Sequence, residues 1–275
     1  MRIGVIYLVP VPIGNLRDIT LRALDVFNSV SLIACEDTRK TAFLLSQYQI
    51  SAPRLLSFHK FNERSREQAI FRHLDGGEDL AIASDAGSPA ISDPAQKLVE
   101  EAIKRGYLVQ ALPGATALIP ALSISGFDCS AFQFVGFLPA KIKDRKLALE
   151  QIRDFPHPSI VYESVHHIKD TLAQMNEYFP ARRVAIAREI SKLHEECIRG
   201  TVADLVLGDN ITEKGEFVIV IDSAEQKPTE FPNPEAELMV AQNPDLKSKN
   251  LAEKLSLRFG ISKNRAYEYV LECRR

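Results

Sequence analysis

Three loops in the sequence combine glycine, proline and small polar residues, and each directly follows an apolar run. The one richest in such residues, ASDAGSPAISDPA, spans 83–95. It lies between an apolar run, 80–83, and a helical pattern, 97–103. Gly87 can adopt positive φ and lets a ligand approach the backbone, while Pro89 stiffens the turn. This loop is therefore a candidate ligand-binding turn at the end of a strand.

The other two loops are PVPIGN, at 10–15, and PGATA, at 113–117. A single loop of this kind is most simply a strand-to-helix turn. Three at strand ends favour a ligand, because open parallel sheets bind ligands at the carboxyl ends of their strands. Helix N-termini suit a carboxylate, and Asp85 could receive an amine or hydroxyl. We expect Ser92 or Asp93 to cap the helix after the second loop, with Pro94 in its first turn.

The ligand does not look like a nucleotide phosphate. The sequence contains neither G-x-x-x-x-G-K-[ST] nor G-x-G-x-x-G after a strand, and the loops offer few consecutive glycines for a pyrophosphate. A smaller zwitterionic or nucleoside-like ligand fits better.

Composition limits the class of protein. The chain has 275 residues, enough for two modest domains, and its net charge of −2 gives no global attraction to nucleic acid. The four cysteines are scattered, which suits a reducing cytosol and argues against a structural zinc site. No apolar run approaches the ~18 residues of a membrane span. We therefore expect a cytoplasmic protein with no metal and no membrane partner.

Apolar runs alternate with helix-period segments, which predicts an α/β fold with a mostly parallel first sheet. The expected strands of the first half are 3–10, 31–35, 54–58, 79–83 and 107–112. The second half repeats the style, with strands expected at 159–162, 183–187 and 216–221. These patterns predict an N-terminal α/β domain at 1–139 and a C-terminal α/β domain at 140–222.

The last part of the chain has a different character. Residues 223–246 carry four prolines and many polar groups, which predicts a linker. Residues 247–275 show two short helical patterns around Gly260, with Ser262 placed to cap the second, and resemble a helix-turn-helix. This tail is locally basic and either contacts nucleic acid or forms an ordinary helical hairpin.

Several long strings in the right order resemble the ribosomal RNA small subunit methyltransferase I family of the tetrapyrrole-methylase class. They are VPVPIGNLRDITLRAL, LIACEDTRKT, SFHKFNE, SDAGSPAISDP, LPGATAL, GFLPAK, VYES, AREISKLHEE and GEFVIVI. The resemblance runs from about residue 7 to 221, and the C-terminal helical pair also fits it.

The resemblance implies a class III methyltransferase fold of two α/β domains, with S-adenosylmethionine in the cleft between them, and a homodimer. It implies 2′-O-methylation of a cytidine ribose in the decoding region of small-subunit (16S) ribosomal RNA, either free or in the assembled subunit. The motif positions that imply cofactor contacts are Pro12, Asp85, Gly87, Ser88, Ile91, Thr116, Ala117 and Tyr162.

The chain departs from the family pattern in two places. The family usually reads E-S-P-H-R where this chain has Val165 and His167 in the third and fifth positions. The histidine removes an arginine that could bind RNA or cofactor. Ala95 stands where the family usually has glycine, which is a mild change because alanine is a good helix former.

Charged residues near strand ends are candidates for the reaction with RNA. Arg39 is a candidate phosphate clamp, and His59 a candidate base; the plainer interpretations are a helix cap and a surface histidine. Glu163 and Glu189 are candidate acid-base or orienting carboxylates, and their spacing suggests no metal. Arg188 and Lys192 are candidate substrate-binding cations, in a loop that could equally be a solvated surface.

Two other functions remain open at this point. The chain could methylate a tetrapyrrole or another small molecule, since a fold does not determine its substrate. It could also be an RNA-binding assembly factor without catalysis. The basic C-terminal pair favours RNA over a porphyrin, and the intact loops favour an enzyme.

Overall fold

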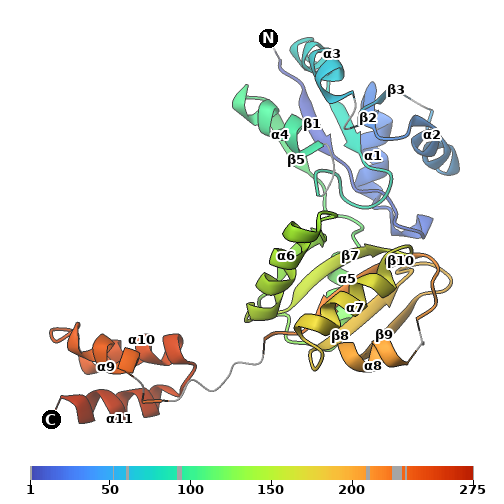
Figure 1. The fold of residues 1–275 in the computed structure, drawn as a ribbon. Coiled ribbons are helices and arrows are strands. Elements are labelled where there is room, and N and C mark those ends of the chain that lie inside the picture. The colour runs from blue at the N-terminus through green and yellow to red at the C-terminus, as the bar shows by residue number, and fades with distance from the viewer. Residues whose placement is uncertain are drawn as a thin grey trace. The chain divides into compact units, whose positions relative to one another are not determined.

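The computed structural model describes residues 2–51, 53–59, 62–91, 95–208, 211–224, 231–232 and 234–274. The chain divides into two compact units, Met1–Ser223 and Ala224–Arg275 (Figure 1). The first unit contains two sheets, and we call each sheet with its helices a lobe. The caps expected at residues 92–94 lie outside the described residues.

The first lobe is built on a parallel sheet with strand order β3-β2-β4-β1-β5. Its strands are β1 (Val5–Leu8), β2 (Leu32–Cys35), β3 (Arg54–Ser57), β4 (Leu80–Ala83) and β5 (Leu108–Ala111). The two central strands, β2 and β4, are buried along their whole length, as continuous apolar runs predict for a sheet covered on both faces. The expected parallel sheet is confirmed.

Helices cover both faces of this sheet. They are α1 (Leu21–Ser29), α2 (Thr38–Gln47), α3 (Glu63–Asp75) and α4 (Ala95–Lys104). Side chains alternate along each strand, so Leu80 and Ile82 pack with α3 and α4 while Ala81 and Ala83 pack with α1 and α2. A short 3-10 helix, η1 (Leu16–Asp18), follows the first loop.

The second lobe has strand order β6-β7-β10-β8-β9. Its strands are β6 (Gln133–Phe137), β7 (Ser159–Ser164), β8 (Arg183–Arg188), β9 (Glu196–Thr201) and β10 (Glu216–Ile221). Only β6 and β7 are parallel; the other pairs are antiparallel. One face packs on α6 (Ile142–Asp154), α7 (Ile168–Tyr178) and α8 (Val202–Leu207), and the other on α5 (Leu118–Ser125).

The second lobe begins earlier than the expected boundary at 139. Strand β6 pairs with β7, and α5 buries Ala121 and Leu122 against Ala185 and Val220 of the second sheet. Neither β6 nor β9 was expected, because their residues are mostly half-buried and β9 is a polar edge strand. The sequence predicted that the second half repeats the arrangement of the first, but the second sheet is mostly antiparallel whereas the first is parallel.

The unit at Ala224–Arg275 has a core of its own. It contains α9 (Pro234–Ala241), α10 (Ser248–Phe259) and α11 (Lys263–Cys273). Gly260 ends α10 with φ of 64°, and the Ser262 hydroxyl accepts a hydrogen bond from the Arg265 amide at 3.3 Å, so the expected turn and cap are confirmed.

The expected linker at 223–246 is partly helical. Helix α9 lies inside it, because Ala236 and Val240 are buried in the same core as α10 and α11. The basic side chains of this unit are partly neutralised, since Lys263 pairs with Glu253 at 2.5 Å and Arg258 with Glu235 at 2.8 Å. No described helix is both long and apolar enough to cross a membrane.

A protein that ends at Ser223 should keep the thermal unfolding transition of the first unit. The buried clusters of Met1–Ser223 and of Ala224–Arg275 share no residues, so removing the second unit exposes little of the first core. Scanning calorimetry measures the transition. A protein ending at Lys214 is the matched control, because it lacks β10, the middle strand of the second sheet, and should not fold. Loss of cooperative unfolding in the Ser223 variant would contradict two independent cores.

Candidate active site

A cavity of about 820 Å³ is lined by strand-end loops of the first lobe and by β6, β7 and β10 of the second. The lining residues are 84–88, 162–164 and 216–218, together with Ile13, Glu36, His59, Ile91, Thr116, Ala117, Phe137 and Ile190. Parallel strands bring the first-lobe loops to one edge of their sheet, which is where ligands bind in such folds.

Hydrogen bonds join the three loops predicted from the sequence. The Val11 amide donates to the Gly87 carbonyl at 3.0 Å, and the Gly87 amide donates back to Val11 at 3.0 Å. The Ser88 hydroxyl donates to the Ala115 carbonyl at 3.2 Å. Gly87 has φ of 74°, the left-handed region that favours glycine, so its predicted positive φ is confirmed. The loops therefore form one connected rim.

Asp85 connects this rim to the loop after β2. Its Oδ1 accepts from the Asp37 amide at 3.0 Å, and its Oδ2 pairs with Lys40 Nζ at 2.7 Å. The Asp85 amide donates to Glu36 Oε1 at 3.2 Å. The hydrogen bond that Lys40 donates to Asp85 raises the pKa of Lys40, which stays protonated. Both carboxylate oxygens thus hold the loop in place before any ligand binds.

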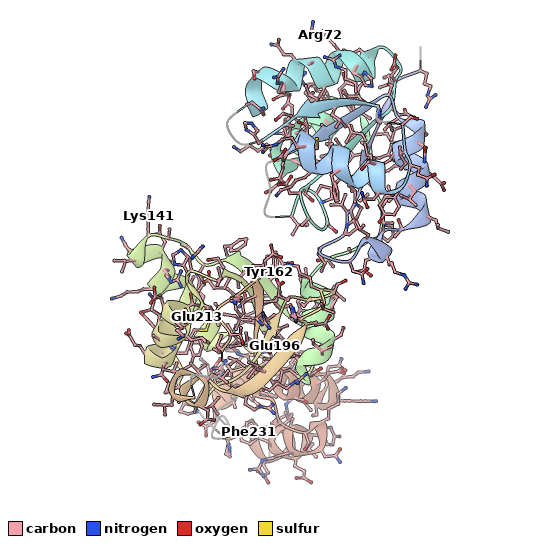
Figure 2. All side chains as sticks on the ribbon, turned by 90° about the vertical axis from the view of Figure 1, so that its right-hand side faces the viewer. Arg72, Lys141, Tyr162, Glu196, Glu213 and Phe231 are labelled. Carbon is pink, nitrogen blue, oxygen red and sulfur yellow. The ribbon has the colours of Figure 1, made fainter. Side chains whose placement is uncertain are left out.

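Tyr162, at the end of β7 (Figure 2), contributes a neutral hydroxyl to the cavity. Burial raises its pKa, and hydrogen bonds with the Thr116 side chain and the Leu118 backbone only partly oppose this effect. The hydroxyl is therefore not a base. It joins β7 to the turn before α5, and because α5 begins only at Leu118, Thr116 and Ala117 remain in the turn and line the cavity.

Ser164 offers the cavity wall an unused polar group. Its Oγ is buried and has no hydrogen-bond partner among the described residues. A buried hydroxyl without a partner costs free energy, but this Oγ has almost no accessible surface, so a ligand reaches it only after neighbouring groups move. The Ser88, Thr116 and Tyr162 side chains of the same lining carry the hydroxyls that fit a polar ligand.

Glu163 is held by its neighbours and is only 6% exposed. Its carboxylate accepts from Thr171 Oγ1 at 2.6 Å and from the Ser164 amide at 2.8 Å, and Arg145 Nη2 lies 3.7 Å away. These contacts hold the carboxylate in one orientation. The geometry therefore suits the orienting role predicted for Glu163, and its acid-base role stays a prediction.

The charged loop after β8 makes its contacts with protein groups. Arg188 is 9% exposed, although the charge density of its segment suggested a surface; it pairs with Glu196 and donates to the carbonyls of Lys214 and His194 at 3.2 and 3.3 Å. A buried guanidinium is tolerated because these acceptors surround it. Its predicted role in substrate binding stays a prediction.

Lys192 in the same loop also contacts protein groups. Its Nζ contacts Glu189 Oε1 at 2.7 Å and Glu216 Oε2 at 2.9 Å. Glu189 and Ser191 have φ of 53° and 69°, strained values for residues with side chains. Lys192 and Glu189 do not line the cavity, but they fix Ile190 and Glu216, which do.

The cavity contains most, but not all, of the predicted site residues. Pro12 and Arg39 instead line a second cavity beside it. Sequence reasoning predicted strand β10 with its correct bounds but missed that its first residue, Glu216, lines the cavity opposite Ser164 in the antiparallel ladder. The string GEFVIVI marked this strand, but its pairing partner was not visible in the sequence. The described residues contain no group of three or more side chains suited to a metal ion.

Comparisons with known proteins agree with this architecture. The family model of Tetrapyrrole (Corrin/Porphyrin) Methylases matches residues 5–206. The chain belongs to the tetrapyrrole methylase family. The ribosomal RNA small subunit methyltransferase I of Pasteurella multocida is 40% identical over 274 residues, covering 98% of this chain and 97% of the relative. The protein of that name from Escherichia coli O157:H7 is 38% identical over 273 residues, covering 98% and 95%.

Two solved structures of low sequence identity share the fold. Uroporphyrin-III C-methyltransferase of Thermus thermophilus, complexed with S-adenosylhomocysteine, matches with a TM-score of 0.56 and 16% identity, covering 79% of this chain and 97% of that one. A diphthine synthase matches with a TM-score of 0.62 and 10% identity, covering 80% and 90%. The predicted fold class and family resemblance are confirmed.

Lys192→Met should destabilise the protein in a pH-dependent way. Burial raises the pKa of Glu189, but hydrogen bonds from Lys192 and the Glu216 amide outweigh it, so the pKa lies below its ordinary 4.5. The ionised pair therefore stabilises the fold above pH 4.5, and this contribution is lost as the pH falls through the folded value. Burial lowers the pKa of Lys192, but its carboxylate partners outweigh that effect and raise it above 10.5.

We expect Lys192→Met to lower the free energy of unfolding by about 1 kcal/mol at pH 7. The difference from the wild-type protein should shrink below pH 4.5 and also above pH 10.5. Urea unfolding across this range measures it, with exposed Lys143→Met as the control. A loss that is the same at pH 3 and pH 7 would show that the ion pair contributes nothing.

Proposed function

We propose that this tetrapyrrole methylase transfers a methyl group from S-adenosylmethionine to the ribose 2′-hydroxyl of a cytidine in the decoding region of small-subunit ribosomal RNA. The observation that carries the proposal is similarity over nearly the whole chain. The proteins named ribosomal RNA small subunit methyltransferase I from Pasteurella multocida and Escherichia coli O157:H7 are 40% and 38% identical over 98% of the chain, whereas two solved uroporphyrin-III C-methyltransferases are 18% and 16% identical over 79% of it.

The cavity fits S-adenosylmethionine by its chemistry. The cofactor supplies an activated methyl group on a sulfonium and carries a zwitterionic amino-acid portion and a nucleoside. Gly87 lets it approach the backbone, and Ser88, Thr116 and Tyr162 contribute hydroxyl side chains to the lining. Ile91 and Ala117 add apolar surface.

The protein contributes mainly alignment to this reaction. The methyl donor is already activated, so holding the ribose hydroxyl in line with it removes much of the barrier. His59 lines the cavity, and we assign it the proton of the 2′-hydroxyl. The Asn62 Nδ2 amide group, which can only donate, lies 3.2 Å from His59 Nε2 and orients the ring, so this hydrogen bond must be released before Nε2 takes up the proton.

The proposed function also includes a cellular location, an oligomeric state and a form of the RNA substrate. We propose that the enzyme acts in the cytoplasm as a homodimer, on ribosomal RNA in free or assembled small subunits. The fold neighbour named uroporphyrin-III C-methyltransferase makes a small-molecule substrate the second candidate. A protein that only binds RNA would not need a cofactor cavity.

A transfer assay with tritiated methyl donor should label small ribosomal subunits that lack the modification. Nuclease digestion should then place the label on a ribose. Label in a uroporphyrinogen offered in parallel would instead identify a small-molecule methylase, and RNA binding without any label would identify an assembly factor.

Gly87→Val should abolish S-adenosylmethionine binding while the protein still folds. A β-branched residue at φ of 74° costs about 1–2 kcal/mol, and its side chain enters the cavity beside Ile13. Gly106→Val is the matched control, since Gly106 also has positive φ but a Cβ there has nothing within 4 Å. Titration calorimetry measures both. Wild-type affinity in a folded Gly87→Val protein would remove this loop from the cofactor site.

A further inference from the structure

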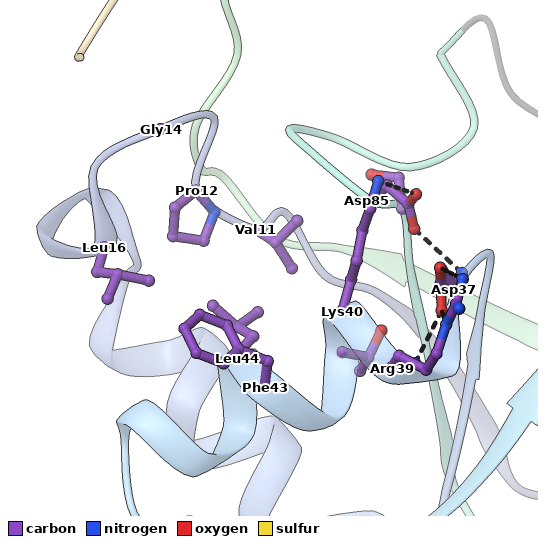
Figure 3. A pocket seen from close by; sticks show the side chains of 12 residues that line it. Val11, Pro12, Gly14, Leu16, Asp37, Arg39, Lys40, Phe43, Leu44 and Asp85 are labelled. Atoms are coloured by element: carbon purple, nitrogen blue, oxygen red, sulfur yellow. Dashed lines mark hydrogen bonds and ion pairs between the residues drawn. The ribbon is translucent and has the colours of Figure 1, made fainter.

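A second cavity of about 520 Å³, drawn in Figure 3, shares part of its lining with the first. Ser84 and Asp85 line both cavities, so the Asp85 loop forms a shared wall. The second cavity lies wholly within the first lobe, between the loop after β1 and helix α2. A polymer whose reacting unit occupies the first cavity could thus place a neighbouring unit in the second.

The second cavity has an apolar wall with an exposed aromatic ring. Phe43 of α2 is 63% exposed, and Leu16 opposite it is 38% exposed. Pro12 and Leu44 complete this wall, as Figure 3 shows. An exposed phenylalanine in a cavity offers a flat surface on which a nucleobase can stack, whatever the base.

Two cations stand one helical turn away from the apolar wall. Arg39 and Phe43 are four residues apart on α2, as are Lys40 and Leu44, so each cation shares a helix face with an apolar neighbour. The Arg39 side chain is 88% exposed and that of Lys40 is 63% exposed. Stacking and phosphate-binding groups are thus adjacent.

Asp37 fixes the Arg39 guanidinium in place and leaves some of its N–H donors for another partner. Its Nε and Nη2 donate to Asp37 at 3.0 and 2.7 Å, and these hydrogen bonds hold the pKa of Asp37 well below its usual range. Asp37 therefore stays ionised and fixes the side chain of Arg39. A guanidinium has five N–H donors, which leaves donors for a phosphate oxygen.

We propose that the second cavity binds the nucleotide next to the methylated one, with its base on Phe43 and its phosphate on Arg39 and Lys40. This inference rests on the proposed RNA methyl transfer and adds to it a contact outside the reacting centre. Such a contact would fix the register of the RNA against the cofactor, since Asp85 joins the two cavities through Lys40.

Steady-state methyl transfer to small ribosomal subunits tests the contact. Phe43→Ala should raise KM for the subunits by about tenfold, with a much smaller change in kcat. Phe43→Trp should keep KM at the wild-type value, because the larger indole ring can still stack on a base. Arg39→Gln should raise KM and reduce its dependence on salt. The affinity for S-adenosylmethionine is measured alongside.

Matched controls come from exposed residues outside both cavities. Phe132→Ala removes an exposed ring and Arg22→Ala an exposed cation of α1. A wild-type KM in Phe43→Ala, or equal effects of Phe43→Ala and Phe132→Ala, would overturn the proposal while leaving RNA methylation intact. If the wild-type protein transferred no methyl group to RNA, the proposed function would fail instead.

Fluorescence provides a readout independent of activity. The chain contains no tryptophan, so Phe43→Trp introduces its one indole, which is excited at longer wavelength than the seven tyrosines. An oligoribonucleotide with the decoding-region sequence should quench its emission saturably, because stacked bases quench indole, and should leave Phe132→Trp unchanged. Quenching of Phe132→Trp alone, or of neither protein, would overturn the proposal. Quenching of Phe43→Trp by added protein instead of RNA would identify a contact between two copies of the chain.

Discussion

The two hydrogen bonds between Val11 and Gly87 hold the candidate site together. They fasten the loop after β1 to the loop after β4, and they are possible because Gly87 has positive φ. Ser88 then reaches the loop after β5, and Asp85 reaches the loop after β2. All four loops meet because the strands are parallel and end at one edge. The site therefore depends on a backbone conformation more than on any single reactive side chain.

The second lobe completes the cavity by a different arrangement. Its strands β7 and β10 are antiparallel, so the end of one lies beside the beginning of the other, and Ser164 is opposite Glu216. The Glu189–Lys192–Glu216 contacts hold the neighbouring loop in a strained conformation, and Ser191 of this loop hydrogen-bonds to Asp18 of the first lobe. Glu189 and Lys192 thus hold Ile190 and Glu216, which line the cavity, and their predicted roles toward a substrate stay predictions.

Local patterns in the sequence predicted much of this structure. The buried runs LIAC and LAIA indicated central strands, the glycine and proline loops indicated a ligand site, and Gly260 with Ser262 indicated the C-terminal hairpin. These signals are local because they reflect burial, positive φ or a helix cap. Which strands pair is not local, so the partner of β10 and the edge strand β9 were missed. The burial of Arg188 also depends on Glu196, which lies on a different strand.

Hydrogen–deuterium exchange with and without S-adenosylmethionine tests the central claim most directly, that one cavity built by both lobes holds the cofactor. The account predicts slower exchange at residues 84–91, 116–118 and 162–164 when the cofactor is bound. It predicts no change in α9, α10 or α11, which contribute nothing to the cavity. Binding of the cofactor without protection of 84–91, or with protection confined to one lobe, would contradict the account.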